Sequence, residues 1–144
     1  MRRILVVAHQ TLGGQHLLEE VGRRMKSGDC SVHVLVPMHH PMGSYSESSL
    51  HAAAEKVLEE GMHRLRSLDT AGATDITGEV GDPKPAYAVE VLRNRGERFD
   101  EILVSTLARG MSNWLRGDVV KKIGRVYPDL DVVHLLGSHE PAFT

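Results

Sequence analysis

Short apolar runs alternate with amphipathic stretches along this chain, and that alternation restricts the fold more than any other feature. The first run, over residues 3–8, is rich in β-branched residues, and apolar residues at helical spacing follow it after Gly13 and Gly14. The same order of strand pattern, turn and helix pattern returns along the chain. Strands are predicted over residues 3–8, 32–36, 74–80, 100–105 and 131–136.

The helix between the second and third strands is the longest that the pattern predicts. Ser46 is suited to cap its first turn, and apolar residues follow one helical face up to Gly72. In the next helix, Asp82 is predicted as the N-cap and Pro83 as the first helical residue. A last helix is predicted over residues 112–127.

Strands that alternate with helices indicate a parallel sheet with helices on both faces. Because crossovers between parallel strands are right-handed, few arrangements of five strands are open to the chain, and the order 3-2-1-4-5 makes the first and fourth strands neighbours. The 144 residues fit one domain, 1–144. The sequence therefore predicts a single-domain α/β protein with an open, five-stranded, Rossmann-like parallel sheet.

Composition and charge argue against several classes of protein. The formal net charge is −2, and the 17 basic residues are interspersed with 19 acidic ones, which disfavours nucleic-acid binding. No apolar run approaches the roughly 20 residues of a membrane helix, and the first residues lack the pattern of a secretion signal. Cys30, the only cysteine, is expected in a polar turn and has no disulfide partner within the chain. These features favour a cytoplasmic protein with neither a nucleic-acid nor a membrane partner.

Polar and glycine-containing segments follow the first, second and fourth predicted strands, where open parallel sheets bind ligands. The start of the helix after the fourth strand would add backbone N–H groups and an arginine, which suit an anion such as phosphate. The residues predicted to bind a cofactor are therefore His9, Gln10, Pro37, Ser105, Thr106, Arg109, Gly110, Ser112 and Asn113.

Recognised catalytic and metal-binding motifs are missing. The chain has neither a P-loop nor a Gly-x-Gly-x-x-Gly segment after the first strand. His9 could serve Ser105 as a base, but no carboxylate is evident to orient the imidazole, and the Gly-x-Ser-x-Gly elbow is absent. No set of the nine histidines has a recognisable ligand spacing, so no metal is predicted. The sequence favours a non-enzymatic role, with a small hydrolase that uses His9 and Ser105 as an alternative.

Strand by strand, the whole chain resembles the universal stress protein family. The resemblance rests on the long helix and on the segments Arg3–Val7, Val34–Pro37, Gly78–Pro83 and Asp100–Thr106. It implies a five-stranded parallel sheet and a role in stress response or signalling, with an unknown protein partner. It also implies a homodimer through the last strand, which here consists of Val132, Val133, His134, Leu135 and Leu136.

Family members that bind ATP carry an Asp at the end of the first strand and a Gly-x2-Gly-x9-Gly-[Ser/Thr] loop. In this chain His9 replaces the Asp, and the four loop positions are occupied by Ser105, Ala108, Asp118 and Val119. A carboxylate near a triphosphate is repulsive, and a Cβ takes up room that the ligand needs. We therefore expect a dimeric, cytoplasmic stress-response or signalling module with nucleotide binding weakened or lost. The alternative is an ATP- or AMP-binding protein in which a modified loop replaces the glycines, through Arg109, Gly110, Ser112 and Asn113.

Overall fold

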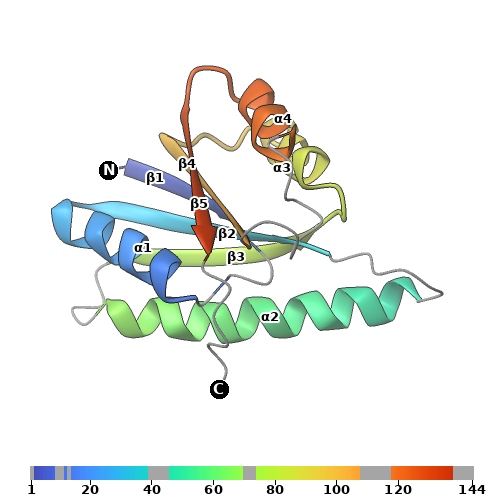
Figure 1. The fold of residues 1–144 in the computed structure, drawn as a ribbon, viewed down its shortest axis with the longest axis horizontal. Coiled ribbons are helices and arrows are strands. Elements are labelled where there is room, and N and C mark those ends of the chain that lie inside the picture. Colours follow the sequence, from blue (N-terminus) through green and yellow to red (C-terminus); the bar gives the residue numbers. More distant parts are fainter. Residues whose placement is uncertain are drawn as a thin grey trace.

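The computed structural model of the chain describes residues 2–8, 12, 14–38, 46–69, 74–107 and 118–137. These residues form a central sheet with helices on both of its faces (Figure 1). The strands are β1 (Arg2–Val7), β2 (Cys30–Pro37), β3 (Asp75–Gly81), β4 (Glu101–Leu107) and β5 (Asp131–Gly137). The helices are α1 (Gln15–Ser27), α2 (Glu47–Leu68), α3 (Pro85–Asn94) and α4 (Asp118–Val126).

The sheet is parallel throughout, and its strands lie in the order β3-β2-β1-β4-β5. The predicted fold class and strand order are therefore confirmed. β1 and β4 are neighbours, with Ile4 opposite Glu101 and Val7 opposite Val104. Helices α1 and α2 cover one face of the sheet, and α3 and α4 cover the other (Figure 1). The point at which the connections change face lies between β1 and β4, where open α/β sheets bind their ligands.

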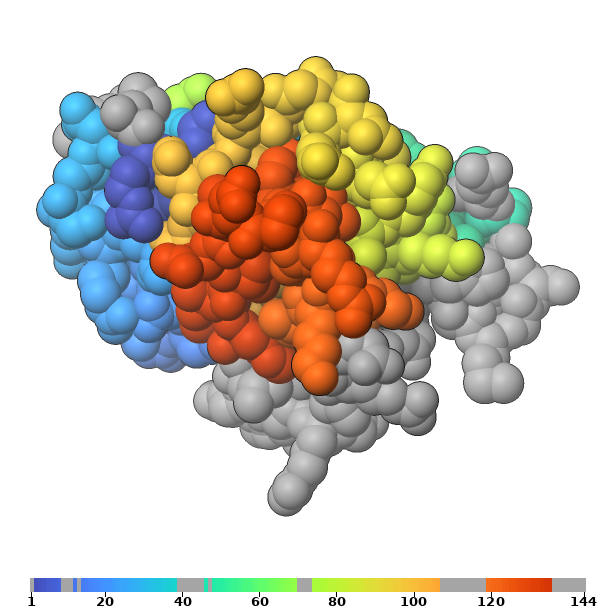
Figure 2. Space-filling view, turned by 90° about the horizontal axis from the view of Figure 1, so that it is seen from above, coloured from blue at the N-terminus to red at the C-terminus, as the bar shows by residue number. Residues whose placement is uncertain are grey.

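The central strand β1 is buried on both faces and divides the core into two layers. Ile4 and Val6 pack on the side of α1 and α2, whereas Leu5 and Val7 pack on the side of α3 and α4. All four residues are fully buried, which explains why β1 has a continuous apolar sequence instead of an alternating one. Figure 2 looks onto the face of the sheet that α3 and α4 cover, and it shows α3 (yellow-green) next to α4 (orange).

The predicted cap of the long helix is confirmed. The backbone of Ser46 is extended, with φ −76° and ψ 148°, and its Oγ accepts a hydrogen bond from the backbone N–H of Ser49 at 3.1 Å. The helix ends at Leu68, before the predicted end at Gly72. Among the helices of the described residues, none is both long and apolar enough to cross a membrane.

Two local predictions are wrong. Helix α3 has Lys84 as its N-cap and Pro85 as its first residue, in place of Asp82 and Pro83. The Asp82 carboxylate accepts a hydrogen bond from the backbone N–H of Lys84 at 2.9 Å, so it closes a turn that precedes the helix. Cys30, expected in a polar turn, is buried at the start of β2, because its backbone is already in register with β1.

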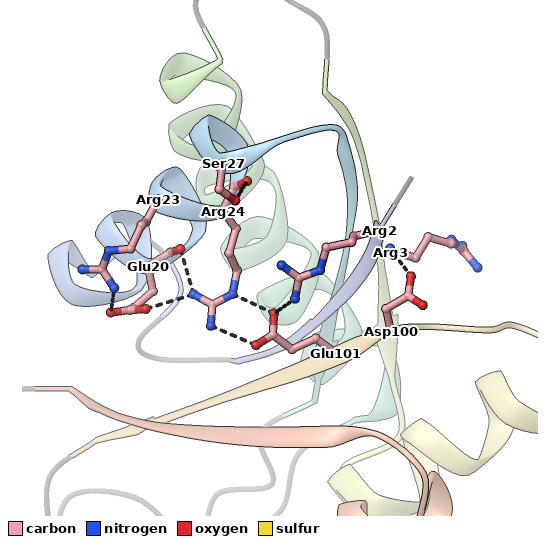
Figure 3. Close-up of polar contacts among 8 residues, drawn as sticks. All are labelled: Arg2, Arg3, Glu20, Arg23, Arg24, Ser27, Asp100 and Glu101. Atoms are coloured by element: carbon pink, nitrogen blue, oxygen red, sulfur yellow. Dashed lines mark hydrogen bonds and ion pairs between the residues drawn. The ribbon is translucent and has the colours of Figure 1, made fainter.

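An ionic network at the amino-terminal end of the strands holds α1 on β4 (Figure 3). Arg24 donates from Nε and Nη2 to the two carboxylate oxygens of Glu101, at 2.8 and 3.0 Å. Nη1 of the same guanidinium bonds Glu20 on α1 at 2.9 Å, and Arg2 of β1 bonds Glu101 at 2.9 Å. The hydrogen bonds from Arg24 are the main reason that the pKa of Glu101 is lowered, so this carboxylate is ionised at neutral pH.

Candidate functional site

The carboxyl ends of the parallel strands meet at one edge of the sheet, which we call the carboxyl edge. Ala8 follows β1 at this edge, Pro37 ends β2 and Leu107 ends β4. Because β1 and β4 lie at the point where the connections change face, a ligand of this fold is expected between them. The sequence predicts the cofactor residues at this edge.

Two of the predicted residues, Ser105 and Thr106, lie near the end of β4, and each is 1% exposed. Successive residues of a strand point to opposite faces of the sheet. Ser105 therefore lies on the α1 and α2 side with Leu103, whereas Thr106 lies on the α3 and α4 side with Val104. The two hydroxyls therefore lie on opposite faces of the sheet. Their grouping in one cofactor site stays a prediction.

The Ser105 hydroxyl contacts an imidazole that is not among the predicted site residues. Its Oγ lies 3.3 Å from Nε2 of His16, in the first turn of α1. The contact follows from matched spacings, because eight helical residues from His16 to Arg24 rise about 12 Å and four strand residues from Glu101 to Ser105 rise about 13 Å. One side of α1 therefore meets β4 at two places, through Arg24 and Glu101 at one end and through His16 and Ser105 at the other.

Burial lowers the pKa of His16 below its ordinary value of 6.5, against the smaller raising effect of the Glu19 and Glu20 carboxylates. The imidazole is therefore neutral at pH 7, with one ring nitrogen that donates and one that accepts. A neutral imidazole can donate a hydrogen bond to the Ser105 hydroxyl or accept one from it. It adds no positive charge to the carboxyl edge, although positive charge favours the binding of a phosphate group.

Thr106 has an imidazole partner on the other face of the sheet. Its Oγ1 lies 2.7 Å from Nε2 of His134 on β5. His134 is opposite Val104 in the strand pair, and Thr106 follows Val104 by two residues on the same face, so the two side chains meet diagonally. His134 is exposed whereas Thr106 is buried, which puts the imidazole on the solvent side of the hydroxyl.

Pro37 is buried at the carboxyl edge, separated from β4 by β1. The ladder to β3 continues past it, since the backbone N–H of Met38 donates to the carbonyl of Gly81 at 2.9 Å. The grouping of Ser105 with His9 stays a prediction. The other predicted cofactor residues lie outside the described part of the chain: His9, Gln10, Arg109, Gly110, Ser112 and Asn113.

The sequence analysis did not predict His16 as a site residue, and it placed His134 in the dimer strand without predicting its contact with Thr106. The first could have been found, because it lies in one helical stripe with Glu20 and Arg24, at spacings of four residues. The direction of His134 depends on the register of β4 and β5, which the sequence does not contain. In the ranges that the structure describes, no group of three or more His, Cys, Asp or Glu residues is placed to hold a metal ion.

Several solved structures share this fold. The universal stress protein UspA from Lactobacillus plantarum matches with a TM-score of 0.68 at 15% identity, over 93% of this chain and 97% of that chain. The universal stress protein from Archaeoglobus fulgidus matches with a TM-score of 0.63 at 12% identity, over 93% of each chain. A universal stress protein family protein from Arabidopsis thaliana with AMP bound matches with a TM-score of 0.56 at 16% identity, over 96% of this chain and 94% of that chain. No family model and no curated protein matches the chain. The chain therefore has the five-stranded parallel α/β fold of the universal stress proteins.

Proposed function

We propose that the protein is a universal-stress-protein-like module that acts as a homodimer in a cytoplasmic stress response or in signalling, with adenine-nucleotide binding weakened or lost. The similarity of fold supports the first part of this proposal. One observation carries the second part: the hydroxyls at the end of β4 are buried and bonded to imidazoles of the same chain. His16 bonds Ser105, and His134 bonds Thr106.

The chemistry of the carboxyl edge supports the proposal of weak nucleotide binding. The Arabidopsis structure contains AMP, so a fold of this kind is compatible with an adenine nucleotide. In this chain, however, Ser105 has a side chain at the position that the resemblance assigns to the first glycine of the phosphate loop. Burial keeps its neighbour His16 neutral at pH 7, so the pair offers a phosphate neither an open backbone nor a cation.

Isothermal titration of the gently purified protein with ATP and with AMP tests this part of the proposal, together with extraction of nucleotide from the denatured protein. We expect no co-purified adenine nucleotide, and no binding heat up to ligand concentrations of about 1 mM. Binding in the micromolar range would instead establish the nucleotide-binding alternative. In that case Arg109→Ala would locate the phosphate, since a strong loss of affinity would place it at the modified loop and unchanged affinity would place it elsewhere.

The dimer is proposed through β5, which lies at an edge of the sheet. Val132, Val133 and Leu135 are each only partly buried there, and an apolar edge strand without a partner exposes backbone hydrogen-bonding groups. A second copy of the chain that pairs along β5 would cover both the backbone and these side chains. The proposed interface consists of Val132, Val133, His134, Leu135 and Leu136.

Val133→Lys tests the interface, because a charge on this edge disfavours strand pairing between copies. We expect a monomer by size-exclusion chromatography with light scattering, where the unchanged protein gives a dimer. Val91→Lys is the matched control, since Val91 lies on α3, is 36% exposed and undergoes the same chemical change away from β5. An unchanged mass for a folded Val133→Lys protein, as judged by circular dichroism, would count against β5 as the interface.

The contact between Ser105 and His16 also bears on the hydrolase alternative. The imidazole that the structure places beside Ser105 is His16, whereas the prediction used His9. A nucleophile must reach the carbon that it attacks, yet Ser105 is 1% exposed. We therefore do not extend the proposal to hydrolysis at Ser105, and we expect Ser105→Ala to leave any trace of esterase activity unchanged.

A further inference from the structure

A second polar cluster lies on the α3 and α4 side of the sheet, at the edge strand β3 and away from the carboxyl edge. Thr77 and Glu79 are two residues apart on β3, so their side chains share a face. His33 of β2 is directly opposite Thr77 in the strand pair, and its neighbour on the same face, Leu35, is opposite Glu79. The register therefore brings a hydroxyl, an imidazole and a carboxylate together.

Both nitrogens of the His33 ring have partners in this cluster. Nδ1 lies 2.7 Å from Oγ1 of Thr77, and Nε2 lies 2.8 Å from Oε2 of Glu79. Burial is the largest single effect on the Glu79 carboxyl and by itself would raise its pKa. The hydrogen bonds from Arg95 and His33 together outweigh burial, so the pKa of the carboxyl is lowered. An ionised carboxylate only accepts hydrogen bonds, so in a neutral ring the proton is on Nε2. The lone pair of Nδ1 then accepts the hydrogen of the Thr77 hydroxyl.

The carboxylate itself is held in place from the end of α3. Arg95 donates from Nη1 and Nη2 to the two oxygens of Glu79, at 3.0 and 2.7 Å. The helix ends at this point because Gly96 has a φ of 88°, and the N–H of Glu97 bonds the carbonyl of Leu92 across the turn. A two-point contact of this kind fixes the plane of the carboxylate and thereby the direction of the imidazole.

The imidazole is also fixed from its other side. Phe99 stacks on the His33 ring, with ring centroids 6.2 Å apart, and the His33 side chain is 12% exposed. Thr77, in contrast, is an exposed residue, so its hydroxyl can be reached from solvent. This separates it from Ser105 and Thr106, which also contact imidazoles but are buried.

We propose that Thr77 is a nucleophile that accepts acyl groups from activated esters and thioesters, with His33 as its general base and Glu79 as the residue that positions His33. A hydroxyl that is bonded to a base, which is in turn oriented by a third group, is the arrangement that activates hydroxyl nucleophiles in proteins. This site is independent of the carboxyl edge and of the function proposed for it.

The chemistry at this site balances without a further reactant. Oγ1 of Thr77 attacks the carbonyl carbon of the acyl donor, and the hydroxyl proton moves to Nδ1 of His33 as the new O–C bond forms. The tetrahedral intermediate then collapses, and the bond from carbon to the leaving oxygen or sulfur breaks. The leaving atom takes the proton from His33. Thr77 is left as an ester and His33 as a neutral imidazole.

Stoichiometric acetylation with p-nitrophenyl acetate tests the proposal on the full chain. We expect a burst of about one equivalent of p-nitrophenolate, and peptide mass spectrometry should place the acetyl group on Thr77. Thr77→Val keeps the shape of the side chain and removes the hydroxyl, so it should abolish the burst. Ser67→Ala is the matched control, because Ser67 is an exposed hydroxyl that bonds a backbone carbonyl and no imidazole.

Variants of the other two residues test their separate roles. His33→Gln should lower the acetylation rate by about 100-fold or more, since a general base typically contributes about 100- to 10,000-fold. Glu79→Ala should lower the rate by less, and it should also remove the preference for a proton on Nε2 in the 15N spectrum of the His33 ring. The spectral change distinguishes positioning from a structural role, since thermal melting alone would not report the tautomer.

Several results would overturn the proposal. Acetyl groups found only on lysines, on the amino terminus or on Ser105 would do so, and so would a burst of the same size in Thr77→Val. Equal acetylation rates in the folded His33→Gln protein and the unchanged protein would remove His33 from the reaction. Because each variant is checked for folding by circular dichroism, a lost burst in an unfolded protein would not be counted as support.

Discussion

Glu101 is the residue on which the ionic contact between α1 and the sheet depends. Its side chain is 10% exposed, and that of Arg24 is 15% exposed, so the pair is largely screened from water. Glu101→Gln keeps the size of the side chain but removes the charge that balances the guanidinium. We expect the free energy of unfolding to fall by about 1–3 kcal/mol, measured by urea denaturation, since Arg24 keeps its bond to Glu20.

Arg2 provides the control for this prediction. It bonds the same carboxylate at 2.9 Å, but its side chain is 54% exposed. Exposed ion pairs contribute little, so Arg2→Gln should cost less than about 1 kcal/mol. If Glu101→Gln costs no more than Arg2→Gln, the buried contact with Arg24 does not hold α1 on β4.

The packing of α2 depends on a glycine in the middle of the helix. A Cβ on Gly61 would overlap the side chain of Leu12, which packs against the α1 and α2 side of the core. Alanine at this position gains helix propensity of up to about 1 kcal/mol, but overpacking typically costs about 1–3 kcal/mol. We therefore expect Gly61→Ala to destabilise the protein by about 1 kcal/mol in urea denaturation.

The same substitution on α1 should have the opposite sign. A Cβ on Gly22 would lie 3.8 Å from Cδ1 of Leu68, which is an ordinary van der Waals distance. Gly22→Ala therefore keeps the gain in helix propensity without a clash, and it should raise the free energy of unfolding by about 0.5–1 kcal/mol. Equal effects at Gly22 and Gly61 would mean that Leu12 moves aside without cost.

At the scale of elements, the sequence predicted kinds of structure better than boundaries. Periodicity identified the strands and helices because burial of one face imposes it on the residues. The start of α3 was misplaced because Asp82-Pro83 and Lys84-Pro85 both offer a proline at a helix start. The side-chain bond of Asp82 to Lys84, which decides between them, becomes visible only with the backbone turn in place.

At the scale of the molecule, the strand order followed from the sequence because right-handed crossovers leave few alternatives. The contacts of the candidate sites did not. His16 meets Ser105 only because α1 lies along β4, and His33 lies between Thr77 and Glu79 only because β2 and β3 pair in one register. Helix placement and strand register are tertiary properties. The sequence could therefore indicate polar residues such as Ser105, but not the side chains that they contact.

Acidification should destabilise the whole molecule in two stages. The folded pKa of His16 lies below its ordinary 6.5, so the unfolded chain binds a proton at this residue before the folded chain does. Stability is therefore lost as the pH falls through about 6.5, and this loss ends below the folded pKa. The second stage comes from Glu20, Glu79 and Glu101, whose lowered pKa values stabilise the fold above about pH 4.5 and cease to do so as the pH falls through the folded values.

His16→Gln separates the two stages, because glutamine does not titrate and can still bond Ser105. Urea denaturation at about pH 7.5, 5.5 and 4 should show that this variant loses less stability than the unchanged protein between the first two values, and as much between the last two. His63→Gln is the matched control, since His63 is exposed on α2 and should leave both losses in place. If His16→Gln and His63→Gln lose the same amount of stability between about pH 7.5 and 5.5, the burial of His16 against Ser105 does not disfavour its protonation. The geometry of the carboxyl edge would then not explain why its imidazole stays neutral at pH 7.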